Sequence, residues 1–256
     1  MKDRTQKEFH RSLDIIDKEL EKHIPGILEG LWELGSMPEY MIDLMDTHIK
    51  SNFFTVTDFG CGKGAVLIQL AEKFDFEGLG IDMVPEFIAS AKKYAREHDV
   101  DHSLEFMCGN FVSILPTIKN QDLVIYGYES DILGDLKTTL HQLRTCVKDN
   151  GYMMIEYIFL DNSQKGKIDG LTEKELLRVI KESNCKLIGR RDWDRERVKG
   201  VNRSNNALIR QNVASLIEKY PENANLFENY FRNQLEECDA LENFFTCTTM
   251  LLRKTL

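Results

Sequence analysis

Short apolar runs alternate with amphipathic stretches along most of this chain. Apolar runs of strand length occupy 53–59, 78–82, 104–107, 123–126, 152–159 and 185–191. Apolar residues recur at helical spacing between them, over 63–74, 85–97, 132–147 and 172–183. Because parallel strands need a crossover, this alternation predicts an α/β fold with a mostly parallel sheet and helices on both faces.

Two further helical regions and a last strand complete the pattern. Residues 1–35 and 199–240 are polar and helical, and 244–253 is rich in β-forming residues. Ser36-Met37-Pro38-Glu39 and Thr172-Glu173-Lys174-Glu175 each match a capping box that starts a helix. We expect a single domain over 1–256, with 1–50 as an N-terminal helical cap and 199–240 as a helical insertion.

A glycine-rich turn, Asp58-Phe59-Gly60-Cys61-Gly62-Lys63-Gly64, joins the first predicted strand to its helix. Glycines let the backbone approach a ligand closely, and a helix N-terminus adds N–H donors. Gly60, Gly62 and Ala65 fit the dinucleotide fingerprint, whereas Asp58 and the three glycines fit Asp-x-Gly-x-Gly-x-Gly. The turn therefore predicts a site for a nucleotide-like molecule, and the glycines alone leave two ligands open.

The surroundings of the turn favour the second pattern. About fifty residues precede the first strand, whereas a dinucleotide domain usually opens on it. Asp58 stands at the strand end, where its carboxylate would crowd a pyrophosphate but would suit a cationic or amine-bearing ligand.

On these residues the chain resembles class I S-adenosylmethionine-dependent methyltransferases of the small-molecule type, which includes the ubiquinone/menaquinone-biosynthesis-like enzymes. Ile81-Asp82-Met83 resembles the acidic end of the family's second strand, and Gly109-Asn110-Phe111 its third-strand motif, where Asp is common at position 110. The resemblance covers roughly 36–160 well and the rest in outline. It implies a Rossmann-like sheet of seven strands with the last one antiparallel.

The resemblance also implies S-adenosylmethionine as the cofactor and assigns residues to it. These are Asp58, Gly60, Cys61, Gly62, Asp82, Met83, Asn110, Phe111, Tyr126 and Gly127. Asp82 is expected to accept from both ribose hydroxyls and Asn110 from the adenine amino group. Met83 and Phe111 would then lie against the purine. Tyr126 and Gly127 would lie beside the methionine part of the donor.

Some of these residues also have a plain structural interpretation. Asn110 fits a turn after a strand, Phe111 fits packing on the next helix, and Met83 fits the core. For Cys61, between two glycines, we favour a small space-filling role, because a reactive thiol would need a lowered pKa.

Three residues are predicted to be catalytic on the acceptor side. Tyr128 and Glu129 follow the fourth strand, and Glu156 is a lone carboxylate in an apolar strand. Methyl displacement needs alignment, and it needs a base only when the acceptor arrives protonated. Glu156 is therefore expected to orient the acceptor or to act as a base of raised pKa. The alternative is a carboxylate bonded to backbone or to a helix end.

Composition limits the partners. The net charge of −9 argues against a broad nucleic-acid surface. No apolar run is long enough to span a bilayer and the first residues form no signal core, so we expect a cytoplasmic protein without a membrane partner. The six cysteines are scattered and the six histidines lack metal spacing, so neither a disulfide framework nor a metal site is expected.

The function predicted from these features is methyl transfer from S-adenosylmethionine to a small-molecule acceptor, with S-adenosylhomocysteine as product. The alternatives are an NAD(P)-dependent oxidoreductase, a non-catalytic S-adenosylmethionine-binding protein of methyltransferase-like fold, and an RNA or protein methyltransferase. For 199–240 the options are a lid that excludes water from the acceptor, surface packing, or a homodimer interface.

Overall fold

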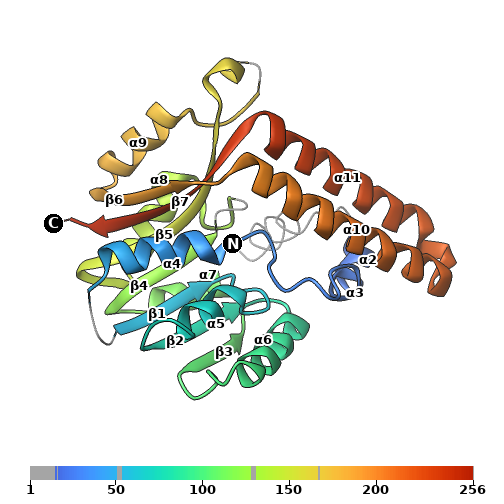
Figure 1. Ribbon diagram of the computed structural model, residues 1–256, viewed down its shortest axis with the longest axis horizontal. Coiled ribbons are helices and arrows are strands. Elements are labelled where there is room, and N and C mark those ends of the chain that lie inside the picture. The colour runs from blue at the N-terminus through green and yellow to red at the C-terminus, as the bar shows by residue number, and fades with distance from the viewer. Residues whose placement is uncertain (1–14, 16, 51–53, 128–130, 167, 256) are drawn as a thin grey trace. The chain divides into compact units, whose positions relative to one another are not determined.

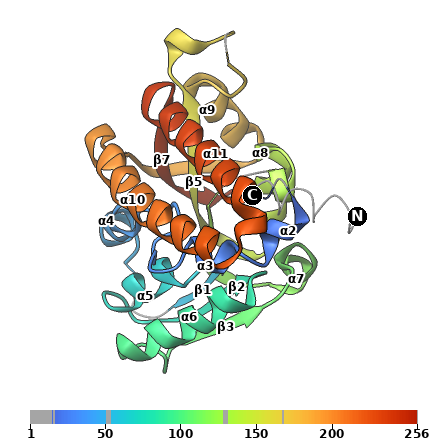
Figure 2. The same ribbon diagram turned by 90° about the vertical axis from the view of Figure 1, so that its right-hand side faces the viewer.

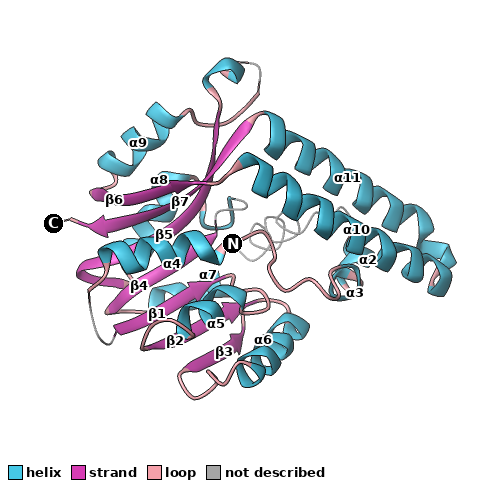
Figure 3. Cartoon of the chain, viewed as in Figure 1, coloured by secondary structure: helices cyan, strands magenta, loops and turns pink. Residues whose placement is uncertain are grey.

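The computed structural model describes residues 15, 17–50, 54–127, 131–166 and 168–255. In this part of the chain one sheet has the strand order β3-β2-β1-β4-β5-β7-β6 (Figures 1 and 3). Its strands are β1 (Phe54–Phe59), β2 (Phe76–Asp82), β3 (Leu104–Cys108), β4 (Gln121–Gly127), β5 (Val147–Leu160), β6 (Cys185–Asp192) and β7 (Phe245–Lys254). The first five pair in parallel and β7 runs antiparallel to β6. The predicted Rossmann-like sheet, with its antiparallel last strand, is confirmed.

Helices cover both faces of this sheet. They are α4 (Pro38–His48), α5 (Ala65–Ala71), α6 (Pro85–Glu97), α7 (Phe111–Ile114), α8 (Leu136–Arg144) and α9 (Glu173–Glu182). Successive side chains of a strand point to opposite faces. Leu123 and Ile125 of β4 therefore join the core beneath α4, α5 and α6, while Val124 and Tyr126 join the core beneath α7, α8 and α9.

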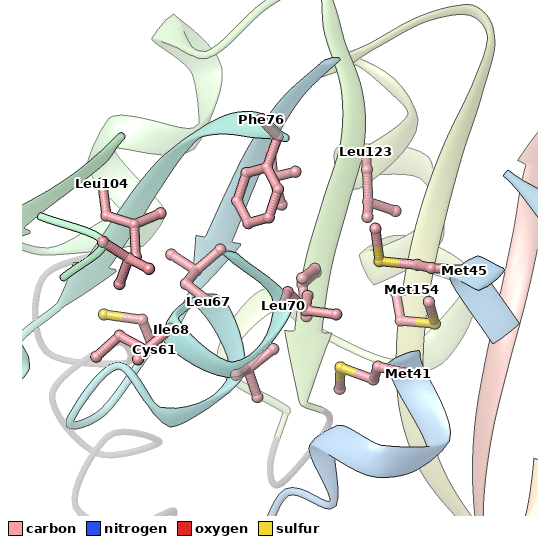
Figure 4. Packing of buried hydrophobic residues seen from close by; sticks show 14 of the residues in the cluster. Met41, Met45, Cys61, Leu67, Ile68, Leu70, Phe76, Leu104, Leu123 and Met154 are labelled. Carbon is pink, nitrogen blue, oxygen red and sulfur yellow. The ribbon is translucent and has the colours of Figure 1, made fainter. Parts of the chain in front are cut away.

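Figure 4 shows how α4 is held on its face of the sheet. Met41 and Met45 project from α4 toward Met154 of β5, and all three side chains are fully buried. Burying a methionine side chain contributes about 1.5–3 kcal/mol. These contacts fix α4, the helix that directly follows residues 32–37.

The chain divides into two compact units, one of 32–192 with 247–256 and one of 1–31 with 193–246. The described part of the second unit contains α2 (Lys18–Glu21), α3 (Ile24–Ile27), α10 (Arg195–Lys219) and α11 (Ala224–Asn243). The last two lie side by side in both ribbon views (Figures 1 and 2). An Asn202–Glu242 hydrogen bond of 2.9 Å links them. The polar helical stretch predicted at 199–240 is thus a pair of helices.

Several local predictions need correction. Ser36 does not cap α4, because the N-cap is Met37 and no side chain bonds the helix end there. By contrast, the Thr172 capping box of α9 is confirmed, with Glu175 as its partner. The helix predicted at 132–147 begins at Leu136 instead, where Asp135 caps it. The 1–35 helix lies partly outside the described residues, and its described part contains two helices of four residues each.

Candidate functional site

The glycine turn after β1 is built from backbone that only glycine adopts readily. Gly60, Gly62 and Gly64 have φ angles of +80°, +52° and +77°. A Cβ on Gly64 would lie 2.9 Å from the ring of Phe106, so a side chain is excluded there by space as well. The N–H of Gly60 donates to the carbonyl of Ile81 at 2.8 Å. The turn therefore exposes backbone and is tied to the end of β2.

Asp82, the last residue of β2, also holds this turn. Its Oδ2 accepts from the N–H of Gly62 at 2.9 Å and its Oδ1 from the N–H of Val84 at 2.9 Å. Burial raises the pKa of this carboxyl, and the backbone donors oppose that rise. The N–H of Met83 also donates to this carboxyl. A carboxylate has lone pairs for more than three donors, so Asp82 can still accept from a ligand while it positions the turn.

Three buried carboxyl groups gather at the carboxyl ends of the parallel strands. Asp58 of β1, Asp82 of β2 and Glu156 of β5 are 4%, 9% and 6% exposed. Burial raises the pKa of Asp58 to about 8, with added repulsion from the other two. Carboxyl groups that resist ionisation in this way gain from a positively charged ligand. The site is therefore suited to a cation.

Glu156 has identifiable partners. Its Oε1 accepts from the N–H of Met37 at 3.2 Å and from the hydroxyl of Thr249 at 3.4 Å. The hydroxyl of Ser36 donates to the same carboxyl, and burial outweighs these donors and raises its pKa to about 7. Since Met37 directly precedes α4, the structure supplies the helix-end partner that was the alternative to catalysis. The catalytic role of Glu156 stays a prediction.

The residues expected at the adenine end have structural partners too. Asn110 Oδ1 accepts from the N–H of Val112 at 3.0 Å and caps α7, a helix that the sequence did not predict. Phe111 is buried, with its ring centroid 6.4 Å from that of Phe59 and 6.2 Å from that of Tyr126. The turn role of Asn110 is therefore present in the structure, whereas these rings place Phe111 against β1 and β4. Asn110 Oδ1 still keeps one lone pair for a ligand.

The remaining predicted residues lie as follows. Met83 is half-buried after β2, Tyr126 is buried near the end of β4, and Gly127 is half-buried at that end. Tyr128 and Glu129 lie outside the described residues. No set of three or more possible metal ligands occurs in the described part of the chain. Among the described helices, none is long and apolar enough to cross a membrane.

Cys61 fills space beneath the turn. Burial, assisted by the charges of Asp82 and Asp58, raises the pKa of its thiol well above the usual value. A Cβ on Gly80 of β2 would lie 2.9 Å from its sulfur. Gly80 thus leaves room for Cys61 and Phe106 beneath the turn, a role that sequence reasoning missed although a glycine inside a strand signals close approach. Among the six cysteines, Cys108 at the end of β3 is the one with an exposed side chain.

Sequence reasoning also missed the segment Trp32–Met37. Its Trp32 indole N–H donates to the carbonyl of Lys63 in the glycine turn at 3.3 Å. Leu34 Cδ1 lies 3.3 Å from where a Cβ of Gly62 would be. The helix predicted over 1–35 would include residues 32–35, and this is wrong, because 32–37 forms neither helix nor strand.

Comparison with known proteins adds to this geometry. A family model described as "Methyltransferase domain" matches residues 50–218. Release factor glutamine methyltransferase of Nitratidesulfovibrio vulgaris is 28% identical over 102 residues, which are 40% of this chain and 34% of that protein. The chain spans about a third to a half of the length of the curated relatives it matches.

Solved structures share the fold over nearly the whole chain. A SAM-dependent methyltransferase from Geobacter sulfurreducens, in complex with S-adenosyl-L-homocysteine, has a TM-score of 0.74 at 19% identity, over 90% of this chain and 96% of that one. The [4+2]-cyclase SpnF has a TM-score of 0.69 at 12% identity, over 98% and 96%. At such identities the likeness concerns the fold.

Proposed function

Since the chain belongs to the methyltransferase domain family, we propose that it transfers a methyl group from S-adenosylmethionine to a small-molecule acceptor. The observation that carries this proposal is the group of buried carboxyls Asp58, Asp82 and Glu156 beside the glycine turn. A sulfonium cation relieves the cost of ionising them, whereas the pyrophosphate of a dinucleotide would add negative charge. The oxidoreductase alternative is therefore disfavoured.

In the proposed complex, Asp82 accepts from the ribose hydroxyls with its remaining lone pairs. The backbone at Gly60 and Gly62 approaches the donor closely because no side chain intervenes. Met83, Asn110 and Phe111 are proposed at the adenine end. Asp58, Cys61, Tyr126 and Gly127 complete the proposed donor site, next to its methionine part.

S-adenosylmethionine supplies an activated methyl group whose transfer leaves a neutral thioether. The contribution of the chain is to align the acceptor atom with that methyl group and to keep water out. Tyr128, Glu129 and Glu156 are proposed to face the acceptor, Glu156 from the part of β5 that pairs with the end of β4. A proton leaves the acceptor only where it arrives protonated, and this is the case that needs a base.

A small acceptor is proposed over a macromolecular one because of the charge of the chain. A net charge of −9 is unfavourable for binding a polyanion such as RNA. The matched relatives include protein methyltransferases by name, one for a release factor and two for ribosomal protein L11. Protein substrates therefore belong in the test as a competing outcome. A cytoplasmic location and a homodimer built with the helical insertion stay proposals.

The test has two steps. Calorimetry with S-adenosylmethionine, S-adenosylhomocysteine and NAD should show binding of the first two; binding of NAD without them would overturn the proposal. Methyl-labelled S-adenosylmethionine is then incubated with the protein and a metabolite extract, with bulk protein and RNA as separate arms. Label in a small molecule supports the proposal. Binding without any transfer would overturn methyl transfer and favour the non-catalytic alternative. A reaction of another kind would be a further explanation, since a [4+2]-cyclase has a similar fold.

A further inference from the structure

We propose that the segment Trp32–Met37, termed here the edge segment, contributes to cofactor binding. In this proposal Trp32 and Glu156 are positioning residues that hold the two ends of the segment, and through it the glycine turn keeps its binding geometry. The inference rests on the proposed function for the identity of the ligand and adds residues that lie outside the family motifs.

The first end of the edge segment is fastened to the glycine turn. Trp32 donates its indole N–H to the carbonyl of Lys63, which lies between Gly62 and Gly64. The indole ring also packs on α6, with centroids 4.9 Å from His98 and 5.4 Å from Tyr94. Because these contacts fix the ring, the hydrogen bond restrains the backbone of the turn.

The middle of the edge segment lies directly against the turn. Leu34 approaches Gly62 so closely that a Cβ there would be 3.3 Å from Leu34 Cδ1. The neighbouring Glu33 accepts from the side chain of Gln69 on α5 at 2.8 Å. The segment therefore contacts both the turn and the helix that the turn begins.

The second end of the edge segment is fastened to β5. Ser36 and Met37 donate to the carboxyl of Glu156, which pairs in register with Gly127 of β4. A Cβ on Gly127 would lie 3.8 Å from the hydroxyl oxygen of Ser36. The segment thus runs along the carboxyl edge of the sheet, from the β1 turn past β4 to β5.

The conformation of this segment depends on the contacts at its two ends. It forms no helix or strand, and Gly35 within it has a φ of +92°. A ligand that needs an ordered turn binds more weakly when the turn must be ordered at the moment of binding. Releasing either end should therefore weaken cofactor binding even though neither side chain needs to touch the cofactor.

The proposal predicts different cofactor affinities for two variants of Glu156. Glutamine keeps an acceptor oxygen for the N–H of Met37, whereas alanine removes it. If Glu156 acts by fastening the segment, Glu156→Gln should rescue what Glu156→Ala loses. If the negative charge is what matters, both variants should lose affinity alike.

The experiment measures the affinity of the full-length chain for S-adenosylhomocysteine by calorimetry. Trp32→Phe deletes one hydrogen bond and is expected to weaken binding about fivefold. Trp193→Phe is the matched control, since Trp193 is the other tryptophan of the chain and lies in the other compact unit, and its affinity should be unchanged. Glu156→Ala is expected to weaken binding by about tenfold or more, and Glu156→Gln by less than about threefold.

The fluorescence of Trp32 gives a second readout, which leaves the edge segment unaltered. In Trp193→Phe, Trp32 is the single tryptophan, so its fluorescence should change when S-adenosylhomocysteine saturates the site. Unchanged emission, or wild-type affinity in both Trp32→Phe and Glu156→Ala, would overturn the inference. Equal losses in the two Glu156 variants would overturn the role given to Glu156. Failure of the wild-type chain to bind either S-adenosyl compound would instead count against the proposed function.

Discussion

Replacing Glu156 by glutamine should make the stability of the chain less sensitive to pH. The wild-type carboxyl lies buried among the Met37 N–H, the hydroxyls of Ser36 and Thr249, and the charge of Glu39, and burial raises its pKa from 4.5 to about 7. Its charge also acts on Asp58. A rise of this size corresponds to roughly 3 kcal/mol between the two protonation states. Glutamine is neutral at every pH and avoids this cost.

The sign follows from where each state loses its proton. At about pH 4 and below, Glu156 is protonated in both the folded and the unfolded chain. As the pH rises toward 7, the unfolded chain loses this proton first, so the free energy of unfolding falls. Above about pH 7 the folded chain ionises as well and the loss is complete. Asp58, with its pKa near 8, contributes in the same direction.

The assay is urea unfolding of the ligand-free chain at pH 5 and pH 8, followed by circular dichroism. The stability of Glu156→Gln relative to wild type should increase by roughly 2–3 kcal/mol between these values. Asp122→Asn is the control. Burial tends to raise the pKa of Asp122, but bonds from Lys148 and Thr55 lower it overall, so this variant should not gain as the pH rises. A difference between Glu156→Gln and wild type that is the same at both pH values would refute the reasoning.

Three further outcomes are expected. Asp82→Ala should weaken S-adenosylhomocysteine binding in calorimetry by about 2–3 kcal/mol, because a charged acceptor for ribose and the Gly62 restraint are lost together; unchanged affinity would contradict the ribose assignment. Gly64→Ala should lower the free energy of unfolding by about 1–3 kcal/mol, and by more than Gly166→Ala. Both glycines have positive φ, but of the two only Gly64 is crowded by Phe106. Equal losses in the two variants would exclude a role for that clash. Binding of S-adenosylmethionine at pH 7 should release protons from the buried carboxyls, and binding of S-adenosylhomocysteine, whose sulfur is neutral, should release fewer protons. Calorimetry in buffers of different ionisation enthalpy measures this release. Identical release for both ligands would show that the sulfonium charge does not act on these carboxyls.

The glycine turn and the acidic end of β2 could be predicted because their chemistry is local in sequence. A strand, three glycines with positive φ and a helix leave a strong pattern within ten residues of Asp58. The restraint of Gly62 by Asp82 needed the structure, although the two residues are only 20 apart.

The partners of Glu156 could not be predicted, because they come from distant parts of the chain. Met37 is separated from it by 119 residues and Thr249 by 93. The sequence also predicted the wrong partner for Ser36. Its spacing to Glu39 fits a capping box, but in the structure its hydroxyl donates to the carboxyl of Glu156 on β5. A tertiary contact that satisfies a buried charge outweighed a local motif.

The exposed thiol of Cys108 gives this protein a natural attachment point for a probe. The other five cysteines are buried, so a thiol-reactive dye should attach there under mild conditions without any engineered residue. Cys108 pairs in register with Asp82 across β2 and β3. A dye on this side chain would therefore report on events at the proposed ribose-binding end of the sheet. Its intensity would give ligand titrations by fluorescence from the unaltered sequence.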